Sequence, residues 1–215
     1  MEHSPKFAQR SDDWFSARLG KVTASRVADV LAKTKTGWGA SRANYRAQLV
    51  AERLTGKREE GYTNSAMQWG IDQEAAARDA YCFYQDVNVT EVGFIVHPSI
   101  AMAGASPDGL ILDDAAISGM VEIKCPNTAT HIETLKTQTI PGKYVTQMMW
   151  QMACTGAAFC DYVSYDPRMP DDMQLFVKRL DRDEGAISEM EAAVIAFLEE
   201  VDADIAALTE IYRKG

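Results

Sequence analysis

The chain has 215 residues, a length that supports one sizeable hydrophobic core, so we expect a single domain over residues 1–215. Apolar residues make up 47% of the chain, yet no uncharged apolar run reaches the roughly 18 residues of a membrane span, so a membrane partner is not expected. The formal charge of −9 argues mildly against nucleic acid as a partner, because phosphate binding normally shows as a basic patch.

The N-terminal half is predicted to be helical. Apolar residues at helical spacing predict helices over residues 23–33, about 41–55 and about 65–86. Thr23 or Ser25 would cap the first helix, because a hydroxyl can accept a hydrogen bond from an exposed amide of the first turn. In the third helix Glu74 interrupts the apolar stripe, and an ion pair with Arg78 one turn later is the simplest reason for an acid there.

Basic residues concentrate in the first third of the chain. Residues 1–60 carry 12 Lys and Arg against 7 Asp and Glu, a local charge of +5, whereas residues 61–215 carry 10 against 24, a local charge of −14. The second predicted helix places Arg42, Arg46 and Arg53 near one face. That face could hold a polyanion such as DNA, with Arg42 as a contact, although ordinary solvated faces explain the same charges equally well.

The rest of the chain is predicted to combine strands and helices. Short β-branched segments between polar turns predict strands over residues 91–97, 99–106, 108–113, 120–125, 159–165 and 174–180. The first four suggest a meander with helices packed on it. Helices are predicted over residues 141–155, opened by Pro141 and ended before Gly156, and over residues 184–213.

One segment, SPDGLILDDAAISGMVEIKCP at residues 106–126, combines two acids, a turn and a lysine. Successive side chains of a strand point to opposite faces, so Glu122 and Lys124 point the same way, while their apolar neighbours point toward packing. The turn DDAAISG returns the second strand beside Asp108. We therefore expect two carboxylates and an amine to face one small volume.

Two carboxylates in a small volume repel each other unless a cation lies between them. Oxygen ligands select a hard ion such as Mg²⁺, which takes one or two carboxylates together with waters and phosphate oxygens. Lys124 can position or deprotonate the attacking water, and the set suits phosphodiester hydrolysis. The acidic pattern alone is common, and a solvated strand edge is its ordinary explanation. Pro107 before the aspartate and Ile123 between Glu122 and Lys124 give the more specific form PD...EIK.

Cysteine and histidine usage does not predict a zinc site. The four cysteines, at positions 82, 125, 154 and 160, form no CxxC pair, and there are only three histidines. The first residues, MEHSPKFAQRSDDWF, lack the basic and apolar regions of a secretory signal. We therefore expect a cytoplasmic protein with buried free thiols.

Five motifs carry a resemblance to a known family. SPDGL, VEIKCP and YDPRM, preceded in order by RLGKVTAS and WGIDQEAAAR, resemble the phage lambda-type exonucleases, or YqaJ-like viral recombinases, of the PD-(D/E)xK superfamily. The resemblance extends from about Asp12 to the last helix. It implies an α/β, restriction-endonuclease-like core with a central mixed sheet flanked by helices.

The same resemblance implies an activity and its partners. Such an enzyme degrades one strand of linear double-stranded DNA from the 5′ end, releases mononucleotides and leaves a 3′ single strand for recombination. It works with Mg²⁺ at alkaline pH, and Mn²⁺ is expected to substitute. A trimeric ring that threads DNA, a single-strand annealing recombinase as partner, and a phage or prophage origin are further expectations.

The resemblance also implies roles for individual residues. Asp108 and Glu122 would be metal ligands, helped by the backbone carbonyl of Ile123, and Lys124 would act on the attacking water. Glu74 matches the acid of the family's WG...E helix and would complete the carboxylate cluster, around one metal or two. This gives a second reason for the place of Glu74 in the apolar stripe.

A pocket for the 5′-phosphate is implied as well, and the matching residues are Arg18, Ser25, Ser106 and Gln147. A guanidinium, two hydroxyls and an amide make a reasonable anion site. Each residue also has an ordinary explanation: Arg18 can pair with Asp12 or Asp13, Ser25 can cap a helix, and Gln147 can be a surface polar residue.

Two further expectations concern Met67 and pH. Where the family can place an apolar wedge that separates the DNA strands, this chain has Met67 beside the polar Gln68.

Lys124 must lose a proton to act as a base, and the ordinary pKa of a lysine is about 10.4. Activity is therefore predicted to rise between neutral pH and about pH 9.

Two other classes of function remain open. A sequence-specific endonuclease or junction resolvase on the same core would cut closed circles or branched DNA. A non-catalytic DNA-end-binding protein or structural subunit would tolerate the loss of Glu122 and Lys124.

Overall fold

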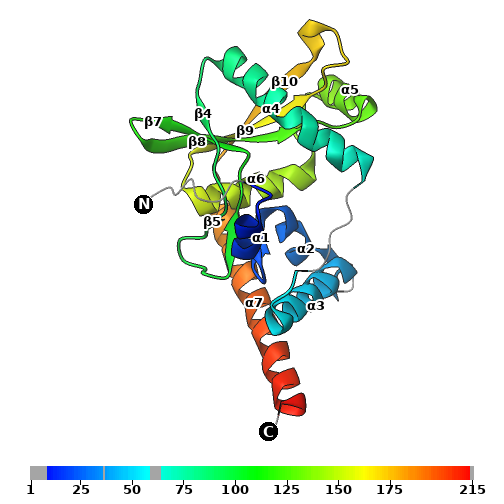
Figure 1. Cartoon of the computed structure of the whole chain (residues 1–215), viewed down its shortest axis with the longest axis vertical. Coiled ribbons are helices and arrows are strands. Elements are labelled where there is room, and N and C mark those ends of the chain that lie inside the picture. Colours follow the sequence, from blue (N-terminus) through cyan, green and yellow to red (C-terminus); the bar gives the residue numbers. More distant parts are fainter. Residues whose placement is uncertain (1–8, 36, 59–63, 214–215) are drawn as a thin grey trace.

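The computed structural model describes residues 9–35, 37–58 and 64–213 (Figure 1). Its helices are α1 (Asp12–Arg18), the 3-10 helix η1 (Ala24–Arg26), α2 (Val27–Val30), α3 (Ala40–Thr55), α4 (Ser65–Gln85), α5 (Thr128–Thr137), α6 (Gly142–Thr155), the 3-10 helix η2 (Asp171–Met173) and α7 (Glu184–Tyr212). Its strands are β1 (Val22–Thr23), β2 (Lys33–Thr34), β3 (Gly37–Trp38), β4 (Val89–Thr90), β5 (Ile95–Val96), β6 (Ala103–Ala105), β7 (Gly109–Asp113), β8 (Ala116–Lys124), β9 (Phe159–Tyr165) and β10 (Leu175–Asp181). None of the helices in these ranges has the length and apolar character needed to cross a membrane.

A five-stranded sheet in the order β10-β9-β8-β7-β4 lies at the centre of the fold. β8 and β9 are parallel, and the other neighbouring pairs are antiparallel. α4 crosses one face of the sheet and α6 lies against the other (Figure 1). The predicted α/β class, with a central mixed sheet flanked by helices, is confirmed.

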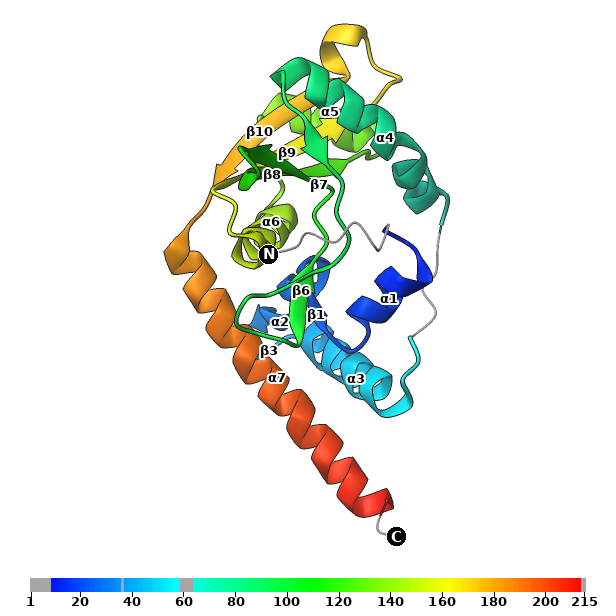
Figure 2. The same cartoon turned by 60° about the vertical axis from the view of Figure 1, so that its left-hand side comes forward.

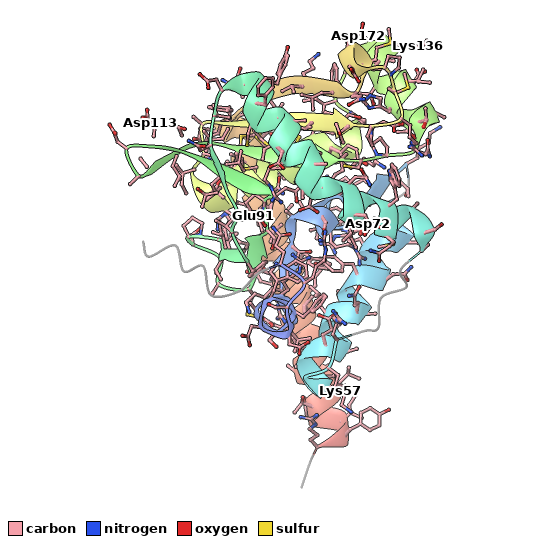
Figure 3. The ribbon with its side chains drawn as sticks, turned by 45° about the horizontal axis from the view of Figure 1, so that its top comes forward. Lys57, Asp72, Glu91, Asp113, Lys136 and Asp172 are labelled. Carbon is pink, nitrogen blue, oxygen red and sulfur yellow. The ribbon has the colours of Figure 1, made fainter. Side chains whose placement is uncertain are left out.

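The parallel strands β8 and β9 end at the same edge of the sheet, and polar side chains lie at that edge. Asp113 lies at the tip of the β7–β8 hairpin and Asp172 lies in the segment that follows β9, on opposite sides of the sheet (Figure 3). β8 and β9 both run from the first side toward the second, and Lys124 is paired with Ser164 near their ends. Ligands of open α/β sheets bind outside the carboxyl ends of parallel strands, so this edge is where a site is expected.

The predicted meander over residues 91–125 is wrong. β5 and β6 lie outside the central sheet and form a separate three-stranded sheet with β1, in the order β1-β6-β5. The antiparallel pairs β5–β6 and β7–β8 are as predicted, but they belong to different sheets. β7 and β8 keep the predicted hairpin. Asp114 and Ala115 close it with φ of 45° and 67°, the left-handed conformation that a tight two-residue turn requires.

The predicted helix over residues 23–33 is also wrong in most of its length, because its first residues form β1 and η1 before the short α2. Thr23 is β-branched and pairs with Gly104 of β6, and its amide donates to the Tyr45 hydroxyl at 3.1 Å. No side chain caps η1 or α2, so neither Thr23 nor Ser25 has the expected capping role. Pairing with a distant strand outweighs the local helical periodicity.

The sequence prediction lacks two described α-helices, α1 and α5, and the short elements β2, β3, β4 and η2. Ser11 caps α1 by accepting from the Trp14 amide at 3.2 Å, and Asn127 caps α5 by accepting from the Thr130 amide at 2.9 Å. Both helices are short and have few apolar residues, which leaves their caps as the main local signal.

Two apolar cores lie on the two faces of the sheet. Ala77 and Tyr81 of α4 pack on Val121 and Ile123 of β8 and on Cys125, which follows the strand. This confirms the predicted alternation, with the apolar side chains of β8 on one face and its charged side chains on the other. The larger core joins α6 to α2, α3 and α7, and its members include Tyr45, Leu49, Met148, Trp150 and Phe197.

α7 is a long helix whose C-terminal half extends beyond the rest of the chain (Figure 2). It neutralises the basic face of α3. Arg42 donates to both carboxylate oxygens of Glu200 at 2.7 and 2.8 Å, Arg46 also contacts Glu200, and Arg53 pairs with Asp202. Arg42 is only 3% exposed, so its guanidinium is not available as the expected DNA contact, and this assignment is corrected.

Candidate active site

Asp108 immediately precedes β7 and lies beside the end of β8. The pairing of Gly109 with Val121 aligns the two strands, and Asp108 Oδ2 accepts a hydrogen bond from the Ile123 amide at 2.7 Å. This bond fixes the aspartate next to the residues that carry Glu122. The predicted return of the second strand beside Asp108 is confirmed.

Glu122 is a fully buried carboxylate held by three side chains. Gln147 Nε2 donates to its Oε1 at 2.5 Å, and Gln151 Nε2 donates to its Oε2 at 2.7 Å. The Lys124 ammonium also donates to Oε1. Burying a charged carboxylate is costly unless hydrogen bonds and an opposite charge compensate, and these three donors supply both.

The proximity of these charges changes two pKa values. Burial, reinforced by Glu122 and by Glu74, raises the pKa of Asp108 to about 8 against the opposing effect of Lys124. Burial alone would lower the pKa of Lys124, but the Glu122 and Asp108 carboxylates outweigh it and raise that pKa above its ordinary value. Lys124 therefore carries a positive charge beside the two carboxylates.

The donor set fits a hard divalent cation. The Glu122 carboxylate disfavours the ionised form of Asp108, and a cation bound by both would relieve that repulsion. Carboxylate oxygens together with the Ile123 carbonyl are ligands that Mg²⁺ accepts, with water completing its coordination.

Glu74 does not join this pair. Its Oε1 contacts Arg78 Nη2 at 3.2 Å and its Oε2 contacts Arg10 Nη2 at 2.8 Å. The predicted i,i+4 pair with Arg78 is confirmed. The expected cluster of three carboxylates is not formed, since the described part of the chain contains no group of three His, Cys, Asp or Glu side chains that could hold one ion.

A cavity of about 130 Å³ adjoins Glu122. Its lining includes all four residues expected at a 5′-phosphate, namely Arg18, Ser25, Ser106 and Gln147. Gln147 belongs to both groups, because it lines the cavity and donates to Glu122. The structure thus places the four residues expected at a 5′-phosphate beside Glu122.

Arg18 supplies the positive charge of this cavity. Its Nη1 donates to the Ser106 hydroxyl at 3.1 Å, and Trp14 Nε1 donates to the same oxygen at 2.9 Å. The guanidinium lies 4.2 Å from the centre of the Trp14 ring. Burial lowers the pKa of Arg18 to about 10, so the side chain stays charged at neutral pH. A half-buried cation whose hydrogen-bond partner is a neutral hydroxyl is well suited to bind an anion.

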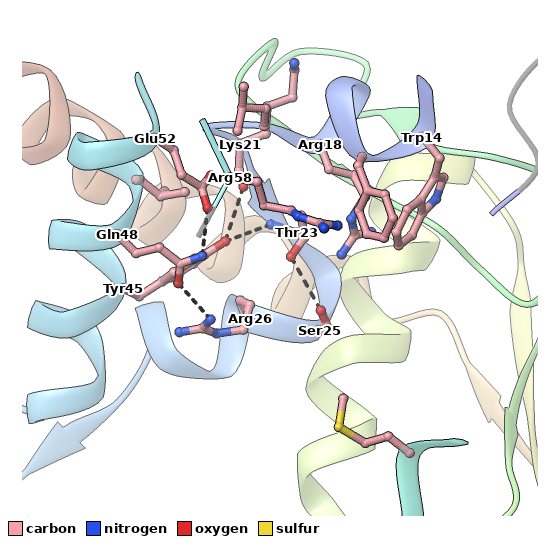
Figure 4. Close-up of a pocket in the computed structure, with 14 residues that line it drawn as sticks. Trp14, Arg18, Lys21, Thr23, Ser25, Arg26, Tyr45, Gln48, Glu52 and Arg58 are labelled. Carbon is pink, nitrogen blue, oxygen red and sulfur yellow. Dashed lines mark hydrogen bonds between the residues drawn. The ribbon is translucent and has the colours of Figure 1, made fainter. Parts of the chain in front are cut away.

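A larger cavity of about 490 Å³ shares Trp14, Arg18 and Ser25 with the first (Figure 4). Its walls add basic and aromatic side chains, Phe15, Lys21, Arg26, Tyr45 and Arg58. Met67 lines the same cavity and is 52% exposed. Basic and aromatic groups together suit a nucleic-acid strand, because they can contact phosphates and stack on bases.

The sequence prediction assigns no site role to Gln9, Trp14 or Gln151, which also line the smaller cavity. Gln151 follows Gln147 by four residues, and that helical spacing could have identified it. Gln9 and Trp14 reach the site through contacts with Pro107 and Ser106, which only the tertiary structure shows.

Comparison with known proteins agrees with this geometry. Residues 13–158 match the family model of the YqaJ-like viral recombinase domain. LHK-Exo, an alkaline exonuclease from Laribacter hongkongensis, is 53% identical, and its crystal structure superposes with a TM-score of 0.87 over 95% of this chain and 99% of that one. A second structure of LHK-Exo, in complex with dAMP, has the same identity, coverage and TM-score.

A more distant structure supports the fold alone. A phage-related exonuclease from Haemophilus somnus 129PT is 14% identical, with a TM-score of 0.68 over 87% of this chain and 96% of that one. Among curated proteins, none is significantly similar in sequence to this chain.

Proposed function

Because this chain belongs to the YqaJ-like viral recombinase domain family and is a nuclease of that type, we propose that it is a Mg²⁺-dependent 5′-to-3′ exonuclease. It degrades one strand of linear double-stranded DNA to mononucleotides and leaves a 3′ single strand for recombination by annealing. One observation carries the proposal: Gln147 joins the Arg18 cavity to the buried carboxylate Glu122. A phosphate held in the cavity therefore lies next to the catalytic groups.

Different residues of the site would orient the carboxylates and hold the metal ion. Gln147 and Gln151 orient Glu122, and the Ile123 amide orients Asp108, so that both carboxylates are presented at the ends of adjacent strands. These two carboxylates would hold a Mg²⁺ ion, which polarises the phosphoryl group and makes water a stronger nucleophile when it is bound. Mn²⁺ would substitute, because it accepts the same oxygen ligands.

Lys124 completes the site as a positioned cation. Its ammonium is held by Glu122 and lies 5.3 Å from the centre of the Tyr144 ring. A charged ammonium can hold the attacking water and stabilise the negative charge that develops on the phosphate oxygens. The raised pKa of Lys124 favours this role over that of a general base.

The size of the Arg18 cavity supports recognition of a terminal phosphate, and membership of the family supports the 5′ polarity. A volume of about 130 Å³ suits a terminal phosphate, whereas an internal phosphodiester would need room for a further nucleotide on its other side. A terminal phosphate also carries the larger negative charge, which strengthens its hydrogen bonds to Arg18. The dAMP bound by the similar exonuclease is a nucleoside monophosphate, the class of product that this reaction releases.

Family membership extends the proposal to the partners of the reaction. We infer a homotrimeric ring around DNA, a single-strand annealing recombinase as the protein that receives the 3′ strand, and work in the cytoplasm of a bacterial host.

The proposal is tested by digesting three substrates with Mg²⁺: a linear duplex with 5′-phosphates, the same duplex with 5′-hydroxyls, and a closed circle. We expect mononucleotides from the linear duplexes, faster from the phosphorylated one, and none from the circle. Glu122→Gln should release none from any substrate.

Other outcomes separate the alternatives. Nicked or linearised circles would make the chain an endonuclease on the same core. Binding to DNA ends without cleavage of any substrate would leave an end-binding protein.

A further inference from the structure

Arg168 lies in the loop after β9 and is fixed by a buried acid. Its backbone amide and Nε donate to Asp166 Oδ1 at 3.0 and 2.7 Å, and its Nη2 donates to Oδ2 at 3.0 Å. Asp166 is 0% exposed, whereas the Arg168 side chain is 46% exposed. Burial alone would raise the pKa of Asp166, but hydrogen bonds from Arg168 and Thr128 lower it to about 2, so the carboxylate stays charged. Arg168 therefore occupies both carboxylate oxygens of Asp166, while its own guanidinium remains accessible from solvent.

Two further contacts fix the plane of the guanidinium. The Trp69 ring of α4 lies 4.4 Å from Arg168 Cζ, and the Pro126 carbonyl accepts from Nη2 at 3.4 Å. Neither contact, nor the pair with Asp166, uses Nη1. A rigid, half-exposed guanidinium with one edge available can bind a phosphate without losing side-chain freedom on binding.

The position of Arg168 is at the catalytic edge of the sheet. Pro126 follows Lys124 by two residues, and Ser164, two residues before Asp166, is paired with Lys124. This edge also carries Asp108, Glu122 and Glu74, so a polyanion that approaches it meets negative charge. A fixed cation beside the carboxylates reduces that repulsion.

The chain contains a second arginine of the same construction that does not lie at this edge. Arg179 of β10 donates to both oxygens of Asp161, at 2.8 and 2.9 Å, and its Cζ lies 3.5 Å from the centre of the Phe159 ring. Its side chain is 51% exposed and Asp161 is 1% exposed. It differs from Arg168 mainly in location, and this makes it a matched control.

We propose that Arg168 binds a backbone phosphate of DNA at the active site, and that Asp166 and Trp69 are the positioning residues that hold its guanidinium for this contact. The proposal rests on DNA being the substrate, as proposed above, and adds a contact outside the Arg18 cavity.

The test compares Arg168→Gln with Arg179→Gln, since both variants keep a hydrogen-bond donor for the buried acid and lose one charge. Binding of a fluorescent 5′-phosphorylated duplex is measured in EDTA over a series of KCl concentrations. Loss of one phosphate contact lowers the slope of log K against log salt by about 0.9. We expect this loss for Arg168→Gln, an unchanged slope for Arg179→Gln, and a restored slope for Arg168→Lys, which keeps the charge.

Melting temperatures separate a DNA contact from a structural role, because both Gln variants weaken one buried ion pair and should lose similar stability. A wild-type slope for Arg168→Gln, or the same decrease in both variants, overturns the phosphate contact. If either of these results is found and the wild type still cuts DNA, the proposed function stands although the Arg168 contact does not. A wild type that neither binds nor cuts DNA overturns both.

Discussion

Glu122 and Asp161 are two buried acids on neighbouring parallel strands, and the chain surrounds them in opposite ways. Asp161 is paired with Val121, the residue before Glu122, and faces α4. The hydroxyl of Tyr81 in α4 donates to Asp161 at 2.7 Å, and Arg179 of β10 donates to both of its oxygens. Glu122 faces α6 and is held by two amides and a lysine next to a cavity. Burial alone therefore does not identify a catalytic acid. The hydrogen-bond partners of the carboxylate and the presence of a neighbouring cavity distinguish the two acids.

Glu122→Gln should give the largest effect on activity. The side chain keeps its size but loses the charge needed for a metal ligand, so we expect cleavage of linear duplex to fall by about a thousandfold or more. The melting temperature should change little, because loss of the ion pair with Lys124 is offset by loss of the repulsion with Asp108. Initial rates with saturating Mg²⁺ and thermal unfolding of the same sample measure both. A variant with full activity would show that Glu122 is structural, like Asp161.

Asp161→Asn should give the converse result. Loss of charge-assisted hydrogen bonds to Arg179 should reduce the free energy of unfolding by about 2 kcal/mol, a change of roughly 30-fold in the folding equilibrium. Activity per folded molecule should not change, since this acid lines neither of the two cavities described above. Urea unfolding and rates measured far below the transition check the two expectations. Loss of activity without loss of stability would contradict the distinction between the two acids.

Arg18→Ala tests the cavity that distinguishes the Glu122 side of the sheet. We expect the preference for 5′-phosphate over 5′-hydroxyl ends to fall by about tenfold, which corresponds to one charge-assisted hydrogen bond. Digestion of the two duplexes in competition gives the ratio directly. An unchanged preference would place the recognition of the terminal phosphate elsewhere.

The pH dependence should come from the catalytic pair alone. The pKa of Asp108 is raised to about 8, so its ionised fraction grows between pH 7 and pH 9. At Mg²⁺ concentrations below saturation, we expect about a tenfold rise in rate over this range and then a plateau. A rate that keeps rising tenfold per unit above pH 9 would instead indicate deprotonation of Lys124. Asp161→Asn should retain the wild-type profile.

Met67→Ala should give the smallest effect, because this side chain lies at the larger cavity and away from both acids. If Met67 is the apolar wedge, digestion of a blunt duplex should slow by about threefold, the effect of losing roughly 0.7 kcal/mol of apolar contact. A duplex with frayed ends should be digested at the wild-type rate. Equal slowing on both substrates would exclude the wedge.

The sequence predicted the catalytic strand better than the parts that surround it. Alternation along β8 placed Glu122 and Lys124 on one face, because the period of a strand is a local property. The role of Arg42 was mispredicted, since a sequence cannot show that an acid 158 residues away, Glu200, occupies the guanidinium. For the same reason Trp14 was missed: its contact with Ser106 spans 92 residues.

Local signals also failed where tertiary pairing was stronger. Periodicity predicted a helix from Thr23, yet the β-branched residues Val22 and Thr23 form a strand that pairs with β6. The placement of Glu74 had two explanations from the sequence. The contacts with Arg78 and Arg10 confirm the ion pair, while a role as metal ligand stays a prediction. Motif and periodicity give the chemistry of single elements, while contacts between distant elements decide which groups are free.

The most direct test of the central claim, that Asp108 and Glu122 form the metal site, is an anomalous-scattering measurement on crystals soaked with Mn²⁺. The account predicts one strong peak within bonding distance of both carboxylates and of the Ile123 carbonyl, absent from Asp108→Asn and present in Asp161→Asn. A peak at other residues, or no peak at a Mn²⁺ concentration that supports cleavage, would contradict it.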